Sequence, residues 1–570
     1  MAEDPDPRTR EELSALLARP DLAATDLADR FSGLLEFGTA GLRGVLGAGP
    51  NRMNRAVVAR ATWGLAQELL ASVPGAAERG VVVGGDARRM SRELSEDTAS
   101  ILAAAGIKVV LFRDPVPTPL VGFAVKSLHA AGGVVVTASH NPPEYNGYKV
   151  YWENAAQIIS PVDARIAHAI GRAPPANQVV RPSLDELRGR GLLSDAPVAI
   201  ERAYLEAVRA LAVHPRAGDR SLRVVYTPMH GVGDSLVRRA LEQAGFAQVT
   251  SVPEQQKPDG AFPTVAFPNP EEPGAMDLAF ALARKIDAQL VLANDPDADR
   301  LAVAVPEPGG GFRQLTGNQV GVLLGHYLLT EKAASRPRVV LASIVSSPLL
   351  GRIAASFGVR YEETLTGFKW IANRAMELER EGLEFVFGYE EALGYCVGDV
   401  VRDKDGISAA ALAAEIAAVL RERGQTVLEA LDGIARRHGV FTSTQVNVTR
   451  KGASGLASIQ AMMDRLRASP PGRIGDDEVA AVCDYDKQVR TDTRQGTTSP
   501  LTLPRSNVLT FELASGSRVI ARPSGTEPKA KFYIDVRQEV GADEPVAAAA
   551  ARATATMRKL ADAFKTLAGA

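Results

Sequence analysis

Cysteine is scarce in this chain. The 570 residues include two cysteines, Cys396 and Cys483, and neither lies in a CxxC pair. The scarcity excludes a disulfide framework and a cysteine-based zinc site, and it fits two reduced thiols in a cytosolic protein. An excess of charge of one sign is lacking too, because 65 Lys and Arg residues stand against 67 Asp and Glu residues. This balance gives no electrostatic footprint for DNA or RNA, so we expect no nucleic-acid partner.

Long apolar runs are also missing. The most apolar helical stretch, residues 409–420, is interrupted by Glu415 and is too short to cross a bilayer. The first residues are acidic and lack the apolar core of a signal peptide. We therefore expect a cytoplasmic protein with no membrane partner. Nothing in the sequence indicates a coiled coil or a dimer strand, which favours a monomer.

The composition is that of an ordinary globular protein, with 46% hydrophobic and 23% charged residues. At roughly 100–200 residues per domain, the length predicts about three to five domains. Three segments repeat one pattern, in which an arginine precedes an apolar strand and two further strand candidates follow. The first strands follow Arg79, Arg223 and Arg338, the second begin near Ile107, Ala247 and Val359, and the third begin near Gly133, Gln289 and Leu383. Short apolar strands that alternate with helical segments indicate parallel α/β units.

The last part of the chain has a different pattern. After about Arg437 come a polar alternating strand at 442–448, further strands, and an Ala-rich helical segment at 546–567. The fold class predicted is α/β: three related α/β domains in series plus a smaller C-terminal α+β domain, four domains around a central cleft. The predicted boundaries are 1–210, 211–315, 316–437 and 438–570.

A loop rich in reactive side chains follows each third strand, beginning at Thr137, Asn294 and Gly388. Ligand sites in open α/β sheets lie at the carboxyl ends of strands. The three loops therefore occupy equivalent places in three units, and they could converge on one cleft.

The first loop contains Ser139 and His140. Turn signals at Asn141-Pro142 and Asn146-Gly147 predict a tight turn that exposes Ser139. An exposed serine beside a histidine is a candidate nucleophile, and Lys149 adds a cation suited to phosphate or to proton transfer. The alternative is an ordinary polar turn.

The second loop carries Asp295, Asp297 and Asp299 after an apolar strand. Three carboxylates this close repel one another unless a cation neutralises them, and oxygen ligands suit Mg²⁺ or Ca²⁺. An EF-hand is excluded, because its sixth position would be Arg300 and its twelfth Pro306. A solvated acidic turn is the remaining alternative.

Three more segments carry candidate binding residues. Glu390 and Glu391, bounded by tyrosines, suit sugar hydroxyls, although acidic residues at a helix N-terminus would look the same. A glycine-rich stretch around Arg43 lacks the spacing of a P-loop. The segment 522–529 has the chemistry of a phosphate nest, or it is a Pro-Gly surface turn. Its candidate ligands are Arg522, Ser524, Gly525, Thr526 and Lys529.

Together these motifs, in this order, resemble the α-D-phosphohexomutase superfamily over roughly Phe37 to Val536. Other segments resemble its phosphoglucomutase-2/phosphopentomutase branch: 146–154, 226–233, 267–272 and 363–370. The resemblance implies a four-domain fold, Mg²⁺ dependence and a phosphoserine resting state. Ala392 stands where many hexose-specific members carry Ser, which agrees with the phosphopentomutase-like branch.

The resemblance also implies roles for residues. Ser139 would carry the phosphoryl group and, with Asp295, Asp297 and Asp299, hold Mg²⁺. Arg43, His140 and Lys149 would transfer protons and stabilise charge. The implied substrate-binding residues are Arg300, Gly367, Lys369, Glu390, Glu391, Arg522, Ser524, Gly525, Thr526 and Lys529.

The function expected is interconversion of sugar 1-phosphates with 6-phosphates, or with 5-phosphates, through a bisphosphate intermediate. Glucose phosphates are the expected substrates, with phosphopentomutase or phosphomannomutase activity as further options, and glucose 1,6-bisphosphate or a related bisphosphate is the expected activator. A metal-dependent phosphohydrolase and a sugar-bisphosphate synthase are the alternatives.

Overall fold

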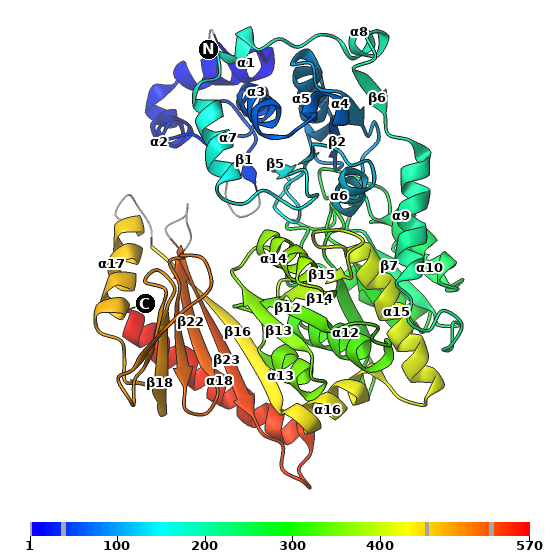
Figure 1. Cartoon of the computed structure of the whole chain (residues 1–570), viewed down its shortest axis with the longest axis vertical. Helices are drawn as coiled ribbons and strands as arrows, with labels where there is room; N and C mark the ends of the chain where they lie inside the picture. Colours follow the sequence, from blue (N-terminus) through cyan, green and yellow to red (C-terminus); the bar gives the residue numbers. More distant parts are fainter. Residues whose placement is uncertain (1–2, 36–40, 451–454, 524–528, 570) are drawn as a thin grey trace. The chain divides into compact units, whose positions relative to one another are not determined.

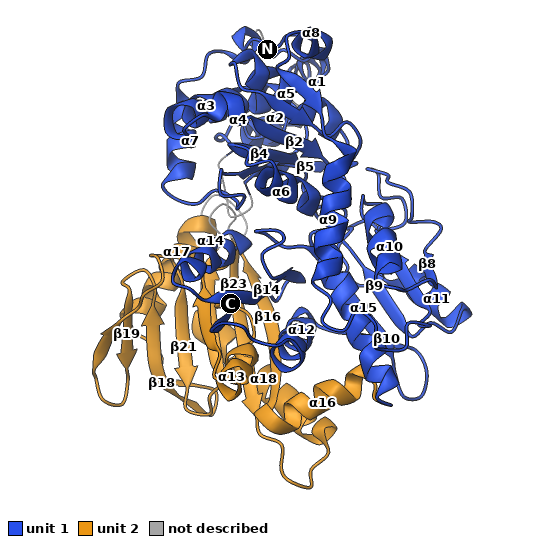
Figure 2. Ribbon diagram, turned by 45° about the vertical axis from the view of Figure 1, so that its right-hand side comes forward, with its two compact units in different colours: residues 1–339, 367–424 blue, residues 340–366, 425–570 orange. Residues whose placement is uncertain are grey.

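The structure is a computed structural model that describes residues 3–35, 41–450, 455–523 and 529–569 (Figure 1). The chain forms two compact units (Figure 2). Unit 1 comprises Met1–Val339 and Gly367–Gly424, and unit 2 comprises Val340–Thr366 and Gln425–Ala570. None of the helices in the described part of the chain combines the length and apolar character needed to cross a membrane.

The first sheet of unit 1 has six strands in the order β1-β5-β4-β2-β3-β6. They are β1 (Leu42–Val45), β5 (Tyr145–Tyr151), β4 (Gly132–Val136), β2 (Val81–Gly85), β3 (Val109–Leu111) and β6 (Leu193–Asp195). The central strands β2 and β4 pair in parallel, whereas β5 is antiparallel to β4 and to β1. Every residue of β2 and β4 is buried, as expected for parallel strands with helices on both faces. The helices of this domain include α3 (Arg55–Ser72), α5 (Ser91–Ala104), α6 (Thr118–Ser127) and α7 (Val162–Gly171).

The second sheet has five strands in the order β11-β10-β9-β7-β8. They are β11 (Phe312–Gln314), β10 (Ala302–Pro306), β9 (Leu290–Ala293), β7 (Val224–Thr227) and β8 (Val249–Ser251). Strand β7 is parallel to β8 and β9, and β10 is antiparallel to β9. The loop between β9 and β10 is the acidic loop, which carries Asp295, Asp297 and Asp299. Helices α10 (Asp234–Gln243) and α11 (Asp277–Lys285) complete this layer.

The third sheet has four strands in the order β13-β12-β14-β15. Its strands are β12 (Arg338–Ser343), β13 (Arg360–Thr364), β14 (Glu384–Glu390) and β15 (Gly394–Val397), and its helices include α12 (Gly317–Glu331), α13 (Leu349–Ser356), α14 (Phe368–Arg380) and α15 (Gly406–Glu422). Strands β14 and β15 form an antiparallel hairpin in which Glu390 pairs with Gly394.

The C-terminal part of unit 2 is an antiparallel sheet of eight strands, in the order β16-β23-β22-β21-β18-β19-β20, with β17 paired to β18. The strands are β16 (Val440–Thr449), β17 (Arg473–Ile474), β18 (Asp477–Asp484), β19 (Val489–Asp492), β20 (Thr498–Pro500), β21 (Leu509–Leu513), β22 (Arg518–Pro523) and β23 (Lys529–Gln538). Helices α17 (Gly455–Ala468) and α18 (Val546–Ala568) share its apolar core, and α16 (Val427–His438) precedes it. Phe564 on α18 lies 4.9 Å from Phe532 and 5.6 Å from Phe511 between ring centroids.

The predicted fold class is confirmed as three α/β domains followed by a C-terminal sheet domain. Each of the nine strand candidates in the three repeats is a strand here: β2, β3 and β4, then β7, β8 and β9, then β12, β13 and β14. The domain boundaries and the central cleft stay predictions.

The turn predicted at Asn146-Gly147 is wrong, because both residues lie inside β5. A Cβ on Gly147 would lie 2.5 Å from the carbonyl oxygen of Thr137 and 2.8 Å from that of Leu42. Glycine is therefore needed for a close approach of backbones and not for a turn. The side-chain amide of Asn146 donates a hydrogen bond of 3.0 Å to Oγ of Ser91, a residue distant in the sequence, and does not stabilise a local turn.

Candidate active site

Ser139 lies in the turn that follows β4 and is only 2% exposed, so the prediction that the turn exposes it is wrong. Its Oγ donates a hydrogen bond of 2.5 Å to Asp295 Oδ2 of the acidic loop. Its Oγ also lies 3.3 Å from Nδ1 of His140. The serine is buried because the loops of two domains meet over it, and the polar partners of its hydroxyl are protein groups.

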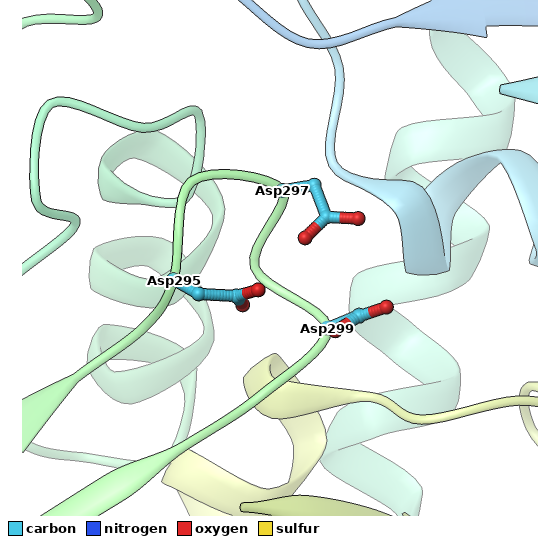
Figure 3. Close-up of side chains that lie close together, drawn as sticks. All are labelled: Asp295, Asp297 and Asp299. Carbon is cyan, nitrogen blue, oxygen red and sulfur yellow. The ribbon is translucent and has the colours of Figure 1, made fainter. Parts of the chain in front are cut away.

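The side chains of the three aspartates of the acidic loop lie close together (Figure 3). Asp295, Asp297 and Asp299 are each 0% exposed, and one carboxylate oxygen of each lies within 4.8 Å of the others. A solvated acidic turn is therefore the wrong interpretation. Burial, followed by repulsion from Asp297 and Asp299, raises the pKa of Asp295 well above its ordinary value.

Two lysines neutralise part of this negative charge. Lys149 on β5 donates hydrogen bonds of 2.8 Å to both Asp297 and Asp299. Lys404 Nζ lies 3.1 Å from Asp299 Oδ2. Burial alone would raise the pKa of Asp299, but Lys149, Lys404 and Arg300 more than offset it, and the pKa is strongly lowered. Burial likewise disfavours the charge of Lys149, yet the two aspartates hold its pKa above the ordinary value.

The acidic cluster fits a divalent cation that prefers oxygen ligands. Asp297 Oδ1 and Asp299 Oδ1 are buried, and neither has a hydrogen-bond partner in the part of the chain that the structure describes. Unpartnered buried carboxylate oxygens are costly unless a cation binds them. Among the described residues, the cluster is the one group of His, Cys, Asp or Glu side chains close enough to share a metal ion, and it contains no histidine. Carboxylate oxygens alone suit Mg²⁺.

Two residues at this cluster were not predicted from the sequence. Lys404 precedes α15 in an Asp-Lys-Asp-Gly sequence, and alternating charges directly before an apolar helix were the available signal. Thr118, the first residue of α6, donates a hydrogen bond of 2.7 Å from its hydroxyl to Asp297 Oδ2. Nothing in its local sequence distinguishes it from an ordinary helix start.

Partly buried arginines lie near the serine. The loop between β4 and β5, which carries Ser139, is the serine loop. Arg43 on β1 donates a hydrogen bond of 2.9 Å to the side-chain oxygen of Asn141 in this loop. Burial, together with repulsion from Arg300, lowers the pKa of Arg43 to about 10, so its guanidinium is charged at neutral pH. Burial and the same two arginines lower the pKa of His140 well below its ordinary value. The histidine next to Ser139 is therefore neutral.

Arg300 connects the acidic loop to the third loop. Its Nε lies 3.9 Å from Asp295 Oδ2 and from Asp299 Oδ1. Its Nη1 donates a hydrogen bond of 2.9 Å to the carbonyl of Ala392. The Arg300 guanidinium thus contacts both loops, so a movement of either loop changes its surroundings.

The third loop is the turn of the β14–β15 hairpin, so the interpretation as a helix N-terminus is wrong. Glu390 ends β14, and its Oε1 accepts a hydrogen bond of 2.7 Å from the backbone N–H of Gly367. Gly367 has φ of 115° at the start of α14. Lys369 lies in the first turn of α14, and burial lowers its pKa although Asp163 opposes the effect. Glu391 lies in the hairpin turn itself.

The structure brings together most of the predicted residues that lie in unit 1. Arg43, Ser139, His140, Lys149, Asp295, Asp297, Asp299 and Arg300 form one cluster of contacts or close charges, and Glu390 with Gly367 forms a second group that Arg300 approaches through Ala392. Arg522 on β22 and Lys529, the first residue of β23, belong to unit 2. Ser524, Gly525 and Thr526 lie outside the described residues.

Comparison with known proteins agrees with this architecture. Three models of phosphoglucomutase/phosphomannomutase α/β/α domains match the chain: domain I at residues 34–175, domain II at 202–310 and domain III at 316–437. A solved structure of a phosphoglucomutase/phosphomannomutase family protein from Burkholderia thailandensis aligns with a TM-score of 0.65 at 22% identity, covering 92% of this chain and 96% of that one. This structural likeness concerns the fold.

Two curated relatives are similar over most of their length. A Haemophilus influenzae protein named "Probable phosphomannomutase" is 42% identical over 489 residues, covering 85% of this chain and 93% of the relative. The human phosphopentomutase is 38% identical over 565 residues, covering 94% of this chain and 90% of the relative. With the three domain matches and the cluster around Ser139, these similarities show that the chain belongs to the phosphoglucomutase/phosphomannomutase family of the α-D-phosphohexomutase superfamily and is a phosphosugar mutase.

Proposed function

We propose that this mutase interconverts sugar 1-phosphates with sugar 6-phosphates, or with pentose 5-phosphates, using Ser139 as the phosphoryl carrier. One observation carries the proposal: the Ser139 hydroxyl lies 2.5 Å from a carboxylate of a buried acidic cluster and 3.3 Å from a histidine nitrogen. A nucleophilic oxygen, proton acceptors and candidate metal ligands are thus together at one point.

The reaction needs two phosphoryl transfers, one from Ser139 to the sugar and one from the sugar back to Ser139. Phosphorylated Ser139 loses its phosphoryl group to a free hydroxyl of the sugar monophosphate, which gives a sugar bisphosphate and the free serine. The Ser139 hydroxyl then gives up its proton and attacks the other phosphate of the bisphosphate. The bond between the sugar oxygen and that phosphorus breaks, the sugar oxygen leaves and takes up a proton, and the isomerised monophosphate and phosphorylated Ser139 result. His140 Nδ1 and Asp295 Oδ2 are the acceptors within reach of that proton.

We assign to three cations the role of stabilising the negative charge that the transferring group gains. Lys149, Arg43 and Arg300 are the candidates, because Lys149 is buried and both arginines are at least half-buried close to the serine or the acidic loop. Fixed charges in a buried site stabilise a transferring phosphoryl group without reorganisation. Asp295, Asp297, Asp299 and the phosphoserine would hold Mg²⁺. When bound, the metal ion supplies further positive charge at the transferring phosphoryl group.

The substrate-binding roles follow the same division. We assign sugar hydroxyls to Glu390, Glu391 and the α14 start with Gly367 and Lys369. We assign the phosphate that is not reacting to the 522–529 segment, namely Arg522, Ser524, Gly525, Thr526 and Lys529. Arginine and backbone amides are suited to a phosphate group at either end of the turned-over bisphosphate.

Glucose phosphates are the substrates we propose first, with pentose and mannose phosphates as further substrates. The domain matches carry the glucose and mannose names, whereas the similarity to a phosphopentomutase extends over more of this chain. Ala392 provides no side-chain hydrogen bond to the sugar, which favours a broad range of sugars. We further propose that glucose 1,6-bisphosphate activates the enzyme by phosphorylating Ser139, and that the enzyme is a cytoplasmic monomer.

The proposal is tested on the purified full chain. Intact mass after incubation with glucose 1,6-bisphosphate should rise by one phosphoryl group, and the added mass should map to Ser139. The Ser139→Ala variant should lose turnover and phosphorylation, whereas Ser127→Ala, at the exposed end of α6, should keep both. Full turnover by Ser139→Ala would refute the role of Ser139.

Kinetics with glucose, mannose, ribose and deoxyribose 1-phosphates rank the substrates. Each is measured with and without added glucose 1,6-bisphosphate. Net formation of bisphosphate in excess over isomerised monophosphate would favour a sugar-bisphosphate synthase. Release of inorganic phosphate without an isomerised product would favour a phosphohydrolase.

A further inference from the structure

Arg88 has no role in the chemistry described above, yet its side chain is completely buried beside the serine loop. It follows β2, the strand parallel to β4, so it lies next to the strand end that carries Ser139. Its guanidinium donates hydrogen bonds to four backbone carbonyls of that loop. The acceptors are Ser139 O at 2.6 Å, Pro142 O at 2.8 Å, Tyr145 O at 3.3 Å and Asn141 O. One side chain thus fixes the loop from Ser139 to the start of β5.

The backbone N–H of Ser139 is fixed from the same strand end. It donates a hydrogen bond of 2.8 Å to Thr137 Oγ1, and that hydroxyl donates a bond of 2.6 Å to Asp86 Oδ2. Asp86 also lies 3.4 Å from Arg88 Nε, so the buried charges of the two residues offset each other. Arg88 therefore holds the carbonyl of Ser139 directly, and Thr137 holds its N–H through a hydroxyl that Asp86, after β2, holds in turn.

The held conformation is one that serine does not adopt readily. Ser139 has φ of 52°, in the left-handed region that is unfavourable for residues other than glycine. Such a conformation persists where surrounding contacts over-determine it. The contacts from Arg88, Asp86 and Thr137 meet this requirement.

A loop of the second α/β domain covers the other face of Arg88. The Arg88 guanidinium lies 4.8 Å from the ring centroid of Phe262. Gly260 forms an isolated parallel β-bridge with Arg88, and a Cβ on Gly260 would lie 2.6 Å from the Ala87 carbonyl oxygen. All these residues belong to unit 1. Arg88 is thus clamped between the nucleophile loop of one domain and a loop of the domain that carries the acidic cluster.

We propose that Arg88 is a positioning residue for phosphoryl transfer: it holds the Ser139 loop in its left-handed conformation and aligns it with the acidic loop through the Gly260–Phe262 segment. The inference rests on the proposed role of Ser139 as the phosphoryl carrier. In-line transfer depends on placing the serine oxygen accurately, and a displacement of about 1 Å can cost roughly 10²-fold in rate. A lysine cannot replace the arginine fully, because a planar guanidinium offers five donors in a fixed fork.

The test compares Arg88→Lys and Arg88→Gln with the matched control Arg89→Gln, whose side chain is exposed. In Arg88→Lys we expect kcat to fall about 10²-fold while KM changes less than about 3-fold. Phosphorylation of Ser139 by glucose 1,6-bisphosphate should slow by a similar factor, and Arg88→Gln should be slower still. Arg89→Gln should match the wild type in all three quantities. Circular dichroism and thermal unfolding report whether each variant is folded.

Phe262→Leu covers the case in which neither Arg88 variant folds. This variant keeps an apolar side chain and every hydrogen bond of Arg88, but it removes the aromatic ring that lies against the guanidinium. For the loss of this cation–π contact we expect kcat to fall about 3–10-fold, with KM nearly unchanged. Wild-type kcat in a folded Arg88→Lys, or in Phe262→Leu when the Arg88 variants do not fold, would overturn the proposal. If the wild type itself neither accepts a phosphoryl group on Ser139 nor turns over sugar phosphates, the proposed function fails instead, and the two failures are thereby distinguished.

Discussion

Three buried aspartates and two buried lysines lie beside Ser139, so the charge on each depends on the others. Lys149 contacts Asp297 and Asp299, while Lys404 contacts Asp299. Asp295 has no lysine within these distances; it accepts hydrogen bonds from the Ser139 hydroxyl and from the backbone N–H of Arg300. The other carboxylate oxygen of Asp297 and of Asp299, Oδ1 in each, has no hydrogen-bond partner among the described residues. A cation would be most favourable beside these two oxygens.

Replacing Asp297 by Asn should therefore weaken the dependence on Mg²⁺. The amide cannot supply the charge of the carboxylate, and Lys149 loses one of its two charged partners. We expect the Mg²⁺ concentration for half-maximal activity to rise by about 10–100-fold or more. Losing a residue that only supports a metal ligand already lowers metal affinity by about 10–100-fold. A titration of initial rates with Mg²⁺ measures it, with the exposed Asp277→Asn as control. An unchanged titration curve would remove Asp297 from the metal site.

A second residue-scale prediction concerns Gly147. Its Cα faces the carbonyls of Thr137 and Leu42 so closely that a methyl group must displace β5 from the serine loop. Gly147→Ala should lower the free energy of unfolding by about 1–3 kcal/mol, as overpacking does, and should reduce turnover with it. Gly171→Ala is the matched control, because nothing lies within 4 Å of the added Cβ. Equal urea-unfolding curves for the two variants would contradict the close-packing argument.

At the residue scale, sequence reasoning could find groups that follow a strand directly. Ser139 and the three aspartates are of this kind, since an apolar strand predicts where the next loop lies. It could not find Arg88, Lys404 or Thr118. Their partners are distant in the sequence, so only the packing of strands and domains makes them neighbours.

At the scale of elements, periodicity predicted the strands well but misjudged two connections. Asn146-Gly147 has the composition of a hairpin turn, but its glycine serves a close backbone approach inside β5. The segment after Tyr389 has acidic residues like a helix start, but it turns into β15 with Leu393 at φ of 62°. In both places tertiary contacts outweighed the local signal.

A tie between two helix ends gives a prediction about pH. Glu331 ends α12, and its carboxylate accepts hydrogen bonds of 2.7 and 3.0 Å from Arg423, the residue that follows α15. His214 Nε2 lies 2.9 Å from the same carboxylate. Arg423 is the main cause that lowers the pKa of Glu331 from 4.5 to about 2. The charged form is thus favoured in the folded chain.

The stability from this tie should be complete above the unfolded pKa and should be lost as the pH falls from about 4.5 towards about 2. The wild type should therefore exceed Glu331→Gln in free energy of unfolding at pH 7, and the difference should shrink at pH 4 and below. Urea unfolding across this range measures it, with Glu242→Gln, an exposed position, as a variant whose difference from wild type should stay small at pH 7. A wild-type advantage that grows on acidification would refute the assignment.

At the scale of the whole molecule, the chain is not divided in sequence order. Unit 2 takes residues 340–366 from the middle of the third α/β domain and joins them to 425–570. Composition and periodicity predicted four successive domains, and they had no means to show that β13 and α13 associate with the C-terminal sheet. Contacts between the two segments join residues far apart in the sequence, such as Arg518 and Glu363, and these leave no periodic signal in the sequence.

Arg518 on β22 is the clearest of those contacts. It donates hydrogen bonds of 2.9 Å to Glu363 of β13 and 2.8 Å to Asp535 of β23, and another to the carbonyl of Ser346. Its side chain is 12% exposed, and that of Asp535 is 3% exposed. Arg518→Met would leave a buried carboxylate without its cation, which costs about 3–5 kcal/mol. Arg505, whose pair with Asp486 is exposed, should cost less than about 1 kcal/mol when changed to Met. Urea unfolding followed by circular dichroism compares the two variants. Equal losses would show that the Arg518 contacts do not hold the two segments of unit 2 together, whereas a much larger loss for Arg518→Met would identify this residue as the tie between them.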